Sequence, residues 1–285
     1  MRKRGLLLCL ALLLVLCQGC TWPHKKTVTI GGQSVTIDPS VPENNLNAAD
    51  LSQQADGKVI YTGGKYLTGI DVSAHQGEIN WKKVAKQVDF AMIQVGYRGY
   101  TEGKLAEDER FRENIQQALK YKLKVGVYFF SQAITAKEAK AEAQYLLKLI
   151  KDYDITLNVA YDWEYIDNVD FGTARTDKIK ENTVTECAAA FCKTIADAGY
   201  QPAIYCNGML GYFSYDLSKL SGVDVWYANY ADPSPEFAYQ IRMWQYSDKG
   251  KLEGVTGNVD LNLYFYDQAS EKKAEKTGVA ASLFS

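Results

Sequence analysis

The chain has 285 residues, of which 47% are hydrophobic and 23% charged, and its formal net charge at pH 7 is −2. This length and apolar content suffice for one large domain or two small ones, and the balanced charge argues against a nucleic-acid-binding protein. After residue 20 the sequence lacks a Cys-x-x-Cys pair, and its two histidines, His24 and His75, lie far apart, so we expect neither a structural zinc site nor a cofactor.

Residues 1–20 have the pattern of an export signal. Basic residues at positions 2–4 precede an apolar run of eleven residues, 6–16, whereas a helix that spans a membrane needs about twenty. The Gly19-Cys20 pair that follows resembles the lipobox of bacterial lipoproteins, although the two positions before Gly19 depart from that pattern. We expect lipidation at Cys20, which would hold the exported protein at the cell envelope. Secretion without lipid and a retained signal anchor are the alternatives.

Residues 21–65 are rich in glycine, serine, asparagine, glutamine and proline. The stretch 26–39 alternates like a short hairpin around Gly31-Gly32, and 44–58 has the composition of a linker. We therefore expect a tether with a short β segment over 21–65, a folded domain over 66–270 and a C-terminal tail over 271–285.

From residue 66 onward, strand-like and helix-like patterns alternate, which predicts an α/β protein with a parallel sheet. Eight strand candidates favour a closed TIM-like (β/α) barrel. The connections after residue 207 are short and poor in helix, so we expect reduced outer helices in the C-terminal half. The predicted strands are 66–73, 89–97, 123–131, 155–165, 201–207, 223–230, 239–247 and 258–266, and the predicted helices are 80–87, 107–122, 136–153 and 174–199.

The fourth predicted strand contains the stretch NVAYDWEY (158–165), in which one residue separates Asp162 from Glu164. This spacing puts both carboxyls on one face of the strand, where a buried pair is costly unless one holds a proton. Asp71 lies near the end of the first strand and Asp260 lies in the last, and these two strands become neighbours when the barrel closes. Because barrels keep their active sites at the carboxyl ends of the strands, we expect the four acids to meet there. The alternatives are turn-capping roles for the lone aspartates and a pair that faces solvent.

Aromatic and amide side chains near the predicted strand ends are candidates for lining a sugar-binding groove, and simple packing explains them equally well. They are Tyr97, Tyr128, Tyr205, Tyr230, Trp244 and Gln245. If Cys20 carries lipid, three cysteines remain after the signal and allow at most one disulfide within the chain. The alternative to a disulfide is that Cys187, Cys192 and Cys206 are small buried apolar residues.

The chain resembles glycoside hydrolase family 25, the Chalaropsis-type lysozymes, over about 66–267 and in the family's order and spacing. The resemblance implies a flattened (β/α) barrel that is short of helices. It also implies an enzyme that cleaves the β-1,4 bond between N-acetylmuramic acid and N-acetylglucosamine in peptidoglycan. The segments that carry it are GIDVSAHQGEINW (69–81), FAMIQVGY (90–97), VGVYFFS (125–131), YDWE (161–164), AGYQPAIY (198–205), WYANY (226–230) and MWQYSDKGKLEGVTGNVDLN (243–262).

Carried over by position, the resemblance implies that Glu164 is the general acid and that Asp162 assists the N-acetyl group of the substrate. Asp71 and Asp260 match the other two active-site acids of the family, which would tune the charge of the site and hold the sugar. The sequence leaves three nucleophiles open, namely the acetamido group, an aspartate and water, and with them a retained or an inverted product.

The resemblance implies that peptidoglycan glycan strands are the binding partner. The membrane would be a second one, through the lipid anchor at Cys20, and we expect a monomer that does not bind nucleic acid. Two other functions are compatible with the same fold. One is a non-catalytic cell-wall-binding lipoprotein, against which the intact set of four acids argues. The other is a hydrolase of another N-acetylated glycan, such as chitin.

Overall fold

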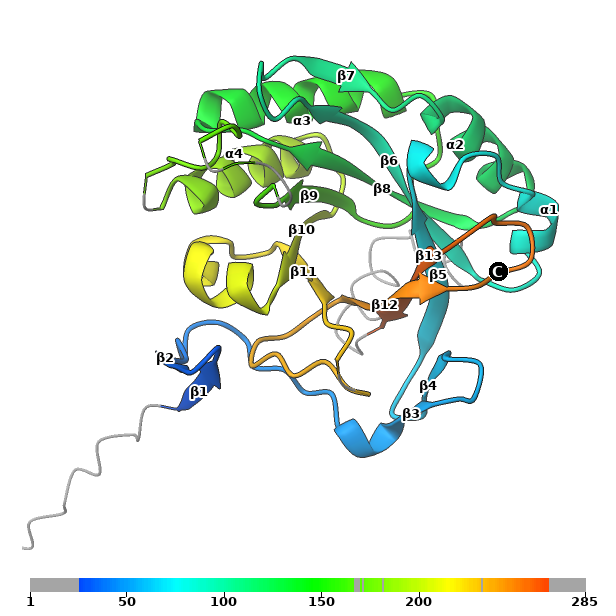
Figure 1. Ribbon diagram of the computed structural model, residues 1–285, viewed down its shortest axis with the longest axis horizontal. Coiled ribbons are helices and arrows are strands. Elements are labelled where there is room, and N and C mark those ends of the chain that lie inside the picture. The colour runs from blue at the N-terminus through cyan, green and yellow to red at the C-terminus, as the bar shows by residue number, and fades with distance from the viewer. Residues whose placement is uncertain (1–25, 167–169, 171, 181, 232, 267–285) are drawn as a thin grey trace, which may run out of the picture.

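The computed structural model describes residues 26–166, 170, 172–180, 182–231 and 233–266, and from residue 66 onward the chain closes into a barrel of eight strands (Figure 1). The strand order is β5-β6-β8-β9-β10-β11-β12-β13, and β5 and β13 close the circle, which confirms the predicted fold. The predicted signal segment with Cys20 and the predicted tail lie outside the described residues. The barrel strands are β5 (Tyr66–Val72), β6 (Phe90–Arg98), β8 (Lys124–Ser131), β9 (Val159–Trp163), β10 (Pro202–Asn207), β11 (Asp224–Ala228), β12 (Met243–Gly250) and β13 (Val259–Phe265).

The last barrel strand runs against the expected direction. The barrel strands from β5 to β12 pair in parallel, whereas β13 is antiparallel to both of its neighbours. Only residues 251–258 join β12 to β13, and a parallel crossover needs roughly a dozen residues or more, usually with a helix. The prediction of a parallel sheet is therefore wrong for this strand. As a consequence, the first residues of β13 lie at the rim where the other strands end.

The described residues contain four α-helices, which lie beside the strands of the first half of the barrel (Figure 1). They are α1 (Trp81–Val84), α2 (Phe111–Lys120), α3 (Ala136–Ile150) and α4 (Thr183–Asp197). In α3, the buried residues Ala139, Ala143, Leu146 and Ile150 recur at helical spacing and form one apolar face. The only helices that the described chain forms after β10 are the π-helix η3 (Leu210–Ser214) and the 3-10 helix η4 (Leu217–Lys219). The predicted loss of outer helices in the second half is confirmed.

Buried apolar side chains form two groups, one inside the barrel and one between the strands and their covering. The inner group includes Phe90, Met92, Tyr128, Tyr205, Trp226 and Met243. Because successive strand residues point to opposite faces, each strand gives alternate residues to the two groups. Whether a residue can reach a site inside the barrel therefore depends on its place in this alternation.

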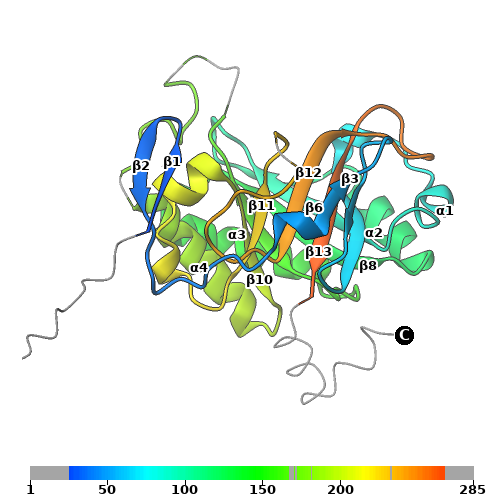
Figure 2. The same cartoon turned by 90° about the horizontal axis from the view of Figure 1, so that it is seen from below.

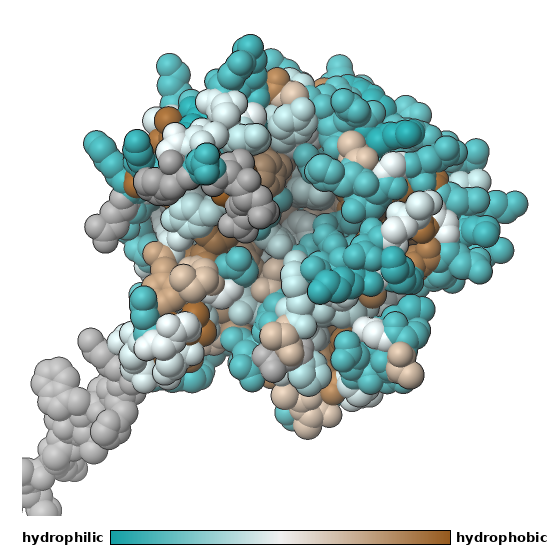
Figure 3. All heavy atoms as spheres, in the orientation of Figure 1, coloured by the Kyte–Doolittle hydropathy of each residue, from teal (hydrophilic) through white to brown (hydrophobic). Residues whose placement is uncertain are grey.

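The outer surface is mostly hydrophilic over α1 and α2 and more apolar over η3 (Figure 3). Met209, just before η3, and Phe213, within it, are among the exposed large hydrophobic residues. None of the described helices is long and apolar enough to cross a bilayer.

The chain before the barrel is more ordered than its composition suggests. Strands β1 (Thr27–Ile30) and β2 (Gln33–Thr36) form the hairpin that the alternation predicts, and Gly31 and Gly32 take the positive φ that its turn requires. The segment 44–58, which we expect to be a linker, contains the 3-10 helix η1 (Ala48–Asp50), and a strand follows this helix directly. Strand β3 (Leu51–Gln53) pairs with β4 (Val59–Tyr61), which completes a second hairpin.

Residues 37–62, which we call the N-terminal belt, pack on the half of the barrel that lacks helices (Figure 2). The Asn44 backbone N–H donates to the carbonyl oxygen of Ala238 at 2.9 Å, and that of Gln240 donates to Pro42 at 2.8 Å. Leu51 is buried in the same core as the outer faces of the strands. The belt thus differs from a free tether because it supplies apolar cover where the outer helices are missing.

Candidate functional site

A cavity of about 570 Å³ opens at the rim where the parallel strands end. Its lining includes all four predicted acids, Asp71, Asp162, Glu164 and Asp260. Asp260 reaches this rim because β13 is reversed and Asp260 is its second residue. No lysine or arginine is present among the described residues that line the cavity. The arrangement is a carboxyl-rich cavity at the end of the barrel that usually carries chemistry.

Asp71 and Asp260 are direct partners in the antiparallel ladder between β5 and β13. The Gln245 amide donates from Nε2 to Oδ2 of Asp71 at 2.8 Å and to Oδ2 of Asp260 at 3.4 Å, and Asn262 Nδ2 donates to Asp71 at 2.7 Å. Burial raises the pKa of Asp71, and these hydrogen bonds oppose the rise. Burial and then the charge of Asp71 raise the pKa of Asp260 to about 8. The pair therefore keeps a proton at neutral pH, held by Asp260.

The orientation of the Gln245 amide is fixed by two tyrosines. The hydroxyls of Tyr205 and Tyr230 donate to Gln245 Oε1 at 2.9 and 2.6 Å, so the Nε2 side faces the two aspartates. In the same way, the indole Nε1 of Trp226 donates to Asn262 Oδ1 at 2.8 Å, which turns the Asn262 amide toward Asp71. Neutral side chains thus hold the acid pair in one arrangement.

Asp162 and Glu164 flank the end of β9 and both line the cavity. Asp162 is buried, and its Oδ1 atom has no hydrogen-bond partner among the described residues. Burial raises the pKa of Asp162 well above its ordinary value, and the charges of Glu164 and then Asp71 raise it further. Trp163 between the two acids points away, and its Nε1 donates to the carbonyl oxygen of Ala133 at 3.2 Å. This alternation puts the two carboxyls on the cavity side.

The predicted lining residues divide into three groups. Tyr97, Tyr128 and Tyr205 line the cavity. Tyr230 reaches the site through its hydroxyl bond to Gln245, and the side chains of Tyr97 and Tyr230 are among the exposed aromatics, at 39% and 47%. Trp244 does not line the cavity, which corrects the prediction. It alternates with Gln245 on β12, so it is buried in the outer core and donates from Nε1 to the carbonyl oxygen of Asn229.

Several residues of the cavity or its support were not predicted as site residues, notably Trp226, Phe130, Gln94, Asn262 and Asp108. Strand alternation is the signal for most of them, since Phe130 follows Tyr128 by two residues and Asn262 follows Asp260 by two. Asp108 gives no such signal because it precedes α2. Its carboxyl accepts the backbone N–H groups of Ala74 and Arg110, both at 2.9 Å, and burial raises its pKa.

The described residues contain no cluster of three or more histidine, cysteine, aspartate or glutamate side chains that is suited to a metal ion. Cys187, Cys192 and Cys206 are buried free thiols, and burial raises the pKa of Cys187 to about 12. A nucleophilic thiolate is therefore not formed at these positions near neutral pH.

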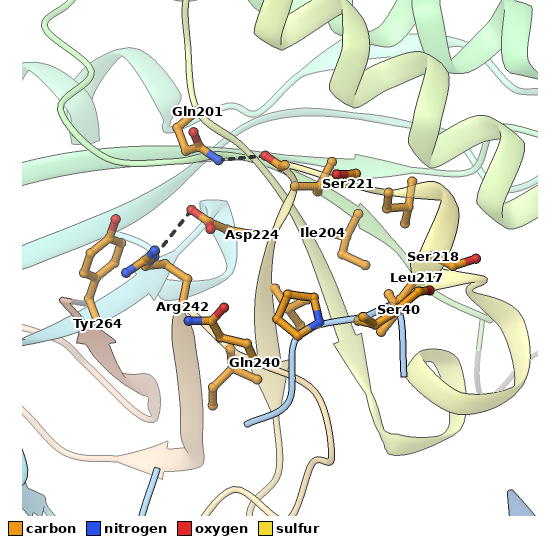
Figure 4. A pocket seen from close by; sticks show the side chains of 17 residues that line it. Ser40, Gln201, Ile204, Leu217, Ser218, Ser221, Asp224, Gln240, Arg242 and Tyr264 are labelled. Atoms are coloured by element: carbon orange, nitrogen blue, oxygen red, sulfur yellow. Dashed lines mark hydrogen bonds and ion pairs between the residues drawn. The ribbon is translucent and has the colours of Figure 1, made fainter. Parts of the chain in front are cut away.

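A second cavity, of about 490 Å³, lies at the opposite ends of β10, β11 and β12 (Figure 4). Arg242 and Asp224 form an ion pair there, with 3.5 Å between Nε and Oδ2, and Gln201 Nε2 donates to the carbonyl oxygen of Gly222. Its lining includes none of the four acids, so we place the chemistry in the first cavity.

The chain is similar in sequence and fold to several known proteins. The family description "Glycosyl hydrolases family 25" matches residues 70–255. The uncharacterized protein YegX of Escherichia coli strain K12 is 26% identical over 206 residues, which cover 70% of this chain and 69% of YegX. Lysozyme M1 of Streptomyces globisporus is 28% identical over 209 residues, which cover 70% of this chain and 67% of that protein. The solved structure of the modular autolysin LytC from Streptococcus pneumoniae matches with a TM-score of 0.62 at 24% identity, covering 84% of this chain and 58% of LytC.

Proposed function

The chain belongs to glycosyl hydrolases family 25 and is a glycoside hydrolase, and from this premise we propose that it is a lysozyme acting on peptidoglycan. The bond cleaved is the β-1,4 linkage between N-acetylmuramic acid and N-acetylglucosamine. One observation carries the proposal: four acids, in or just beyond three strands, converge on one cavity, with tyrosines at its wall and no lysine or arginine among the described lining residues. The lysozyme and autolysin names of the relatives support the same substrate.

In this proposal Glu164 is the general acid. It stands at the end of β9 and lines the cavity, where its carboxyl can protonate the glycosidic oxygen as the bond to the anomeric carbon breaks. The proton leaves with the hydroxyl of the departing sugar, and positive charge develops on the ring that remains. Carboxylates nearby stabilise that charge in a cavity partly closed to water.

Asp162 assists the N-acetyl group of the substrate. Its buried Oδ1 atom has no hydrogen-bond partner among the described residues, and the acetamido N–H of the substrate can donate a hydrogen bond to it. Such a hydrogen bond favours the ionised form of Asp162, which otherwise keeps a raised pKa. The proton that the raised pKa keeps on Asp162 then moves to Glu164, where acid catalysis requires it. Substrate binding thereby prepares the general acid for the reaction.

With its N–H held by Asp162, the acetamido oxygen attacks the anomeric carbon as the glycosidic bond breaks. A water molecule then opens the cyclic intermediate, and Glu164 takes the proton of that water, which restores its acid form. Two displacements at one carbon give a product with retained configuration.

Asp71, Asp260 and Gln245 form a support on the other side of the cavity. The proton on Asp260 limits the negative charge of this support, and the Gln245 amide fixes both carboxyls. Such a network holds a charged intermediate without having to reorganise during the reaction. Tyr97 and Tyr230, partly exposed at the site, offer apolar faces to the sugar rings.

Export of the chain and anchoring through lipid on Cys20 would place this activity at the cell wall. The support is the basic and apolar pattern of residues 1–20 together with the Gly19-Cys20 pair. One acyl chain binds a membrane only marginally, so stable retention requires two or more chains on the anchor.

Reducing-end analysis of digested peptidoglycan tests the proposed function. The purified protein is incubated with peptidoglycan, the new reducing ends are reduced with borohydride, and the resulting amino-sugar alcohols are identified. We expect the alcohol derived from N-acetylmuramic acid. The alcohol derived from N-acetylglucosamine would assign the other bond, and release from chitin oligosaccharides alone would assign another glycan. No new reducing ends from either polymer would contradict a catalytic function.

A further inference from the structure

The side chain of Gln132 links the end of β8 to the backbone of Glu164. Its Nε2 atom donates to the carbonyl oxygen of Glu164 at 2.8 Å and to that of Ser131 at 3.0 Å. We propose that Gln132 is a positioning residue that holds the backbone of Glu164, and so aims the carboxyl of Glu164, for the proposed hydrolysis.

The β-ladder itself does not reach Glu164. The last residue pair between β8 and β9 is Ser131 with Trp163, and the next residue on each strand lies beyond the ladder. The Gln132 amide supplies at this point the hydrogen bond that a further backbone N–H would have made. It therefore extends the ladder by one residue, to the acid that the chemistry needs.

The other end of the Gln132 amide is fixed as well. Thr176 Oγ1 donates to Gln132 Oε1 at 3.0 Å, which orients the amide so that Nε2 points at Glu164. Gln132 and Thr176 are fully or almost fully buried, so water does not compete for these bonds. Arg175, next to Thr176, pairs with Glu138 of α3 at 2.7 Å and anchors the same part of the chain.

A buried amide is costly unless its donors and acceptor are satisfied, so an apolar residue would suit this position if packing were its only role. Gln132 follows the apolar run VYFF and Ser131, and it is one of few fully buried polar residues outside the acid site. One of the two hydrogen bonds that its Nε2 atom donates ends on the backbone of Glu164. A misplacement of about 1 Å at a reacting group can lower the rate about 100-fold, which gives this bond a catalytic consequence.

Three variants test the proposal with a soluble, defined peptidoglycan oligosaccharide as substrate. Gln132→Ala should lower kcat about 10–100-fold and leave KM within about twofold, because the acid is displaced while the groove remains. Gln132→Glu keeps the shape, but its ionised carboxylate cannot donate to the Glu164 carbonyl. Its loss in kcat should therefore grow as pH rises and shrink at acid pH, where the protonated carboxyl donates again. Thr176→Val should lower kcat in the same direction by a smaller factor.

Gln87 offers a matched control. Its Nε2 atom also bridges two backbone carbonyl oxygens, those of Lys83 at 3.0 Å and Glu253 at 2.9 Å, but outside the cavity. Gln87→Ala should lower the melting temperature while leaving kcat unchanged. All rates are measured at a temperature at which circular dichroism shows each variant to be folded.

The proposal would be overturned if folded Gln132→Ala kept the wild-type kcat, or if Gln87→Ala lost as much. A pH profile of Gln132→Glu parallel to that of the wild type would also contradict it. If Gln132→Ala does not fold, the pH profile of Gln132→Glu and the kcat of Thr176→Val test the positioning role in its place. The positioning role rests on the proposed function, and the activity of the wild type distinguishes failure of one from failure of the other. Inactive wild type would overturn both, whereas active wild type with unaffected Gln132 variants would overturn only the positioning role.

Discussion

Asp71 and Asp260 face each other across the ladder that closes the barrel, and Gln245 donates a hydrogen bond to each carboxyl. The contact depends on the reversal of β13, which brings the start of that strand to the rim where β5 ends. Barrel closure and the assembly of the acid site are therefore the same structural event.

The raised pKa of Asp260 predicts how stability depends on pH. Its pKa is about 8 in the folded protein against an ordinary value of 3.8, so between these values the folded state holds a proton that the unfolded state has released. The stabilisation that Asp260 contributes to the folded state is fully present below about pH 4 and is lost as the pH rises through about 8. Asp260→Asn cannot ionise, so its stability relative to the wild type should increase between pH 5 and pH 9.

Urea unfolding of both proteins at pH 5, 7 and 9 measures this difference. The buried carboxyl of Glu142 in α3, whose pKa burial raises to about 7, is present in both proteins and therefore does not account for a difference between them. Asp152→Asn, at an exposed position, is the control. Parallel stability curves for the wild type and Asp260→Asn would show that Asp260 does not hold the proton.

The N-terminal belt predicts a second effect on stability. Leu51 is buried between the belt and the barrel, so Leu51→Ala should cost about 2–5 kcal/mol of the free energy of unfolding. Ser52→Ala on the same strand, at an exposed position, should change it by less than about 0.5 kcal/mol. A belt that is only a tether would give no difference between these variants in thermal unfolding.

The barrel could be predicted because its signals are local and repeated. Each strand is an apolar run of suitable length, and helical patterns separate the early ones. The direction of β13 could not be predicted in the same way, because it depends on the path of a short connection rather than on the strand itself. The belt was hidden for another reason: few apolar residues, such as Leu51 and Val59, anchor a stretch whose composition is otherwise that of a linker.

Prediction of the site from the sequence has the same limit, because local patterns do not show which residues meet in three dimensions. The spacing of Asp162 and Glu164 on one strand face could be inferred from alternation alone. For Trp244 and Gln245 the alternation gave no decision, because both are buried and only the three-dimensional structure tells the inner face from the outer. The link from Gln132 to Glu164 spans two strand ends, and no pattern in the sequence indicates such a contact.

Asp162→Asn tests the route of the reaction. If Asp162 holds the acetamido group during attack, the variant should lose about as much activity as a general-acid variant, about 10²–10⁴-fold. The product of the wild type should keep its anomeric configuration. NMR of the first-formed anomer from a defined oligosaccharide measures this. An inverted product would exclude acetamido attack and assign water as the nucleophile, with Glu164 still the acid.

Cys20 predicts the location of the protein. The wild type should partition with membranes after export, and Cys20→Ser should be released or remain unprocessed. Fractionation with mass spectrometry of the mature N-terminus checks this. A wild type that is wholly soluble outside the cell, with its N-terminus at another residue, would contradict lipidation.

The central claim is that Glu164 donates the proton to the leaving sugar, and its most direct test compares two leaving groups. Glu164→Gln keeps the shape of the side chain but cannot donate. On the natural glycan its kcat should fall about 10²–10⁴-fold, with unchanged melting. On an aryl glycoside whose leaving group departs without protonation, the same variant should stay within about tenfold of the wild type. Equal losses on both substrates, or no loss on the natural glycan, would contradict the assignment of Glu164 as the general acid.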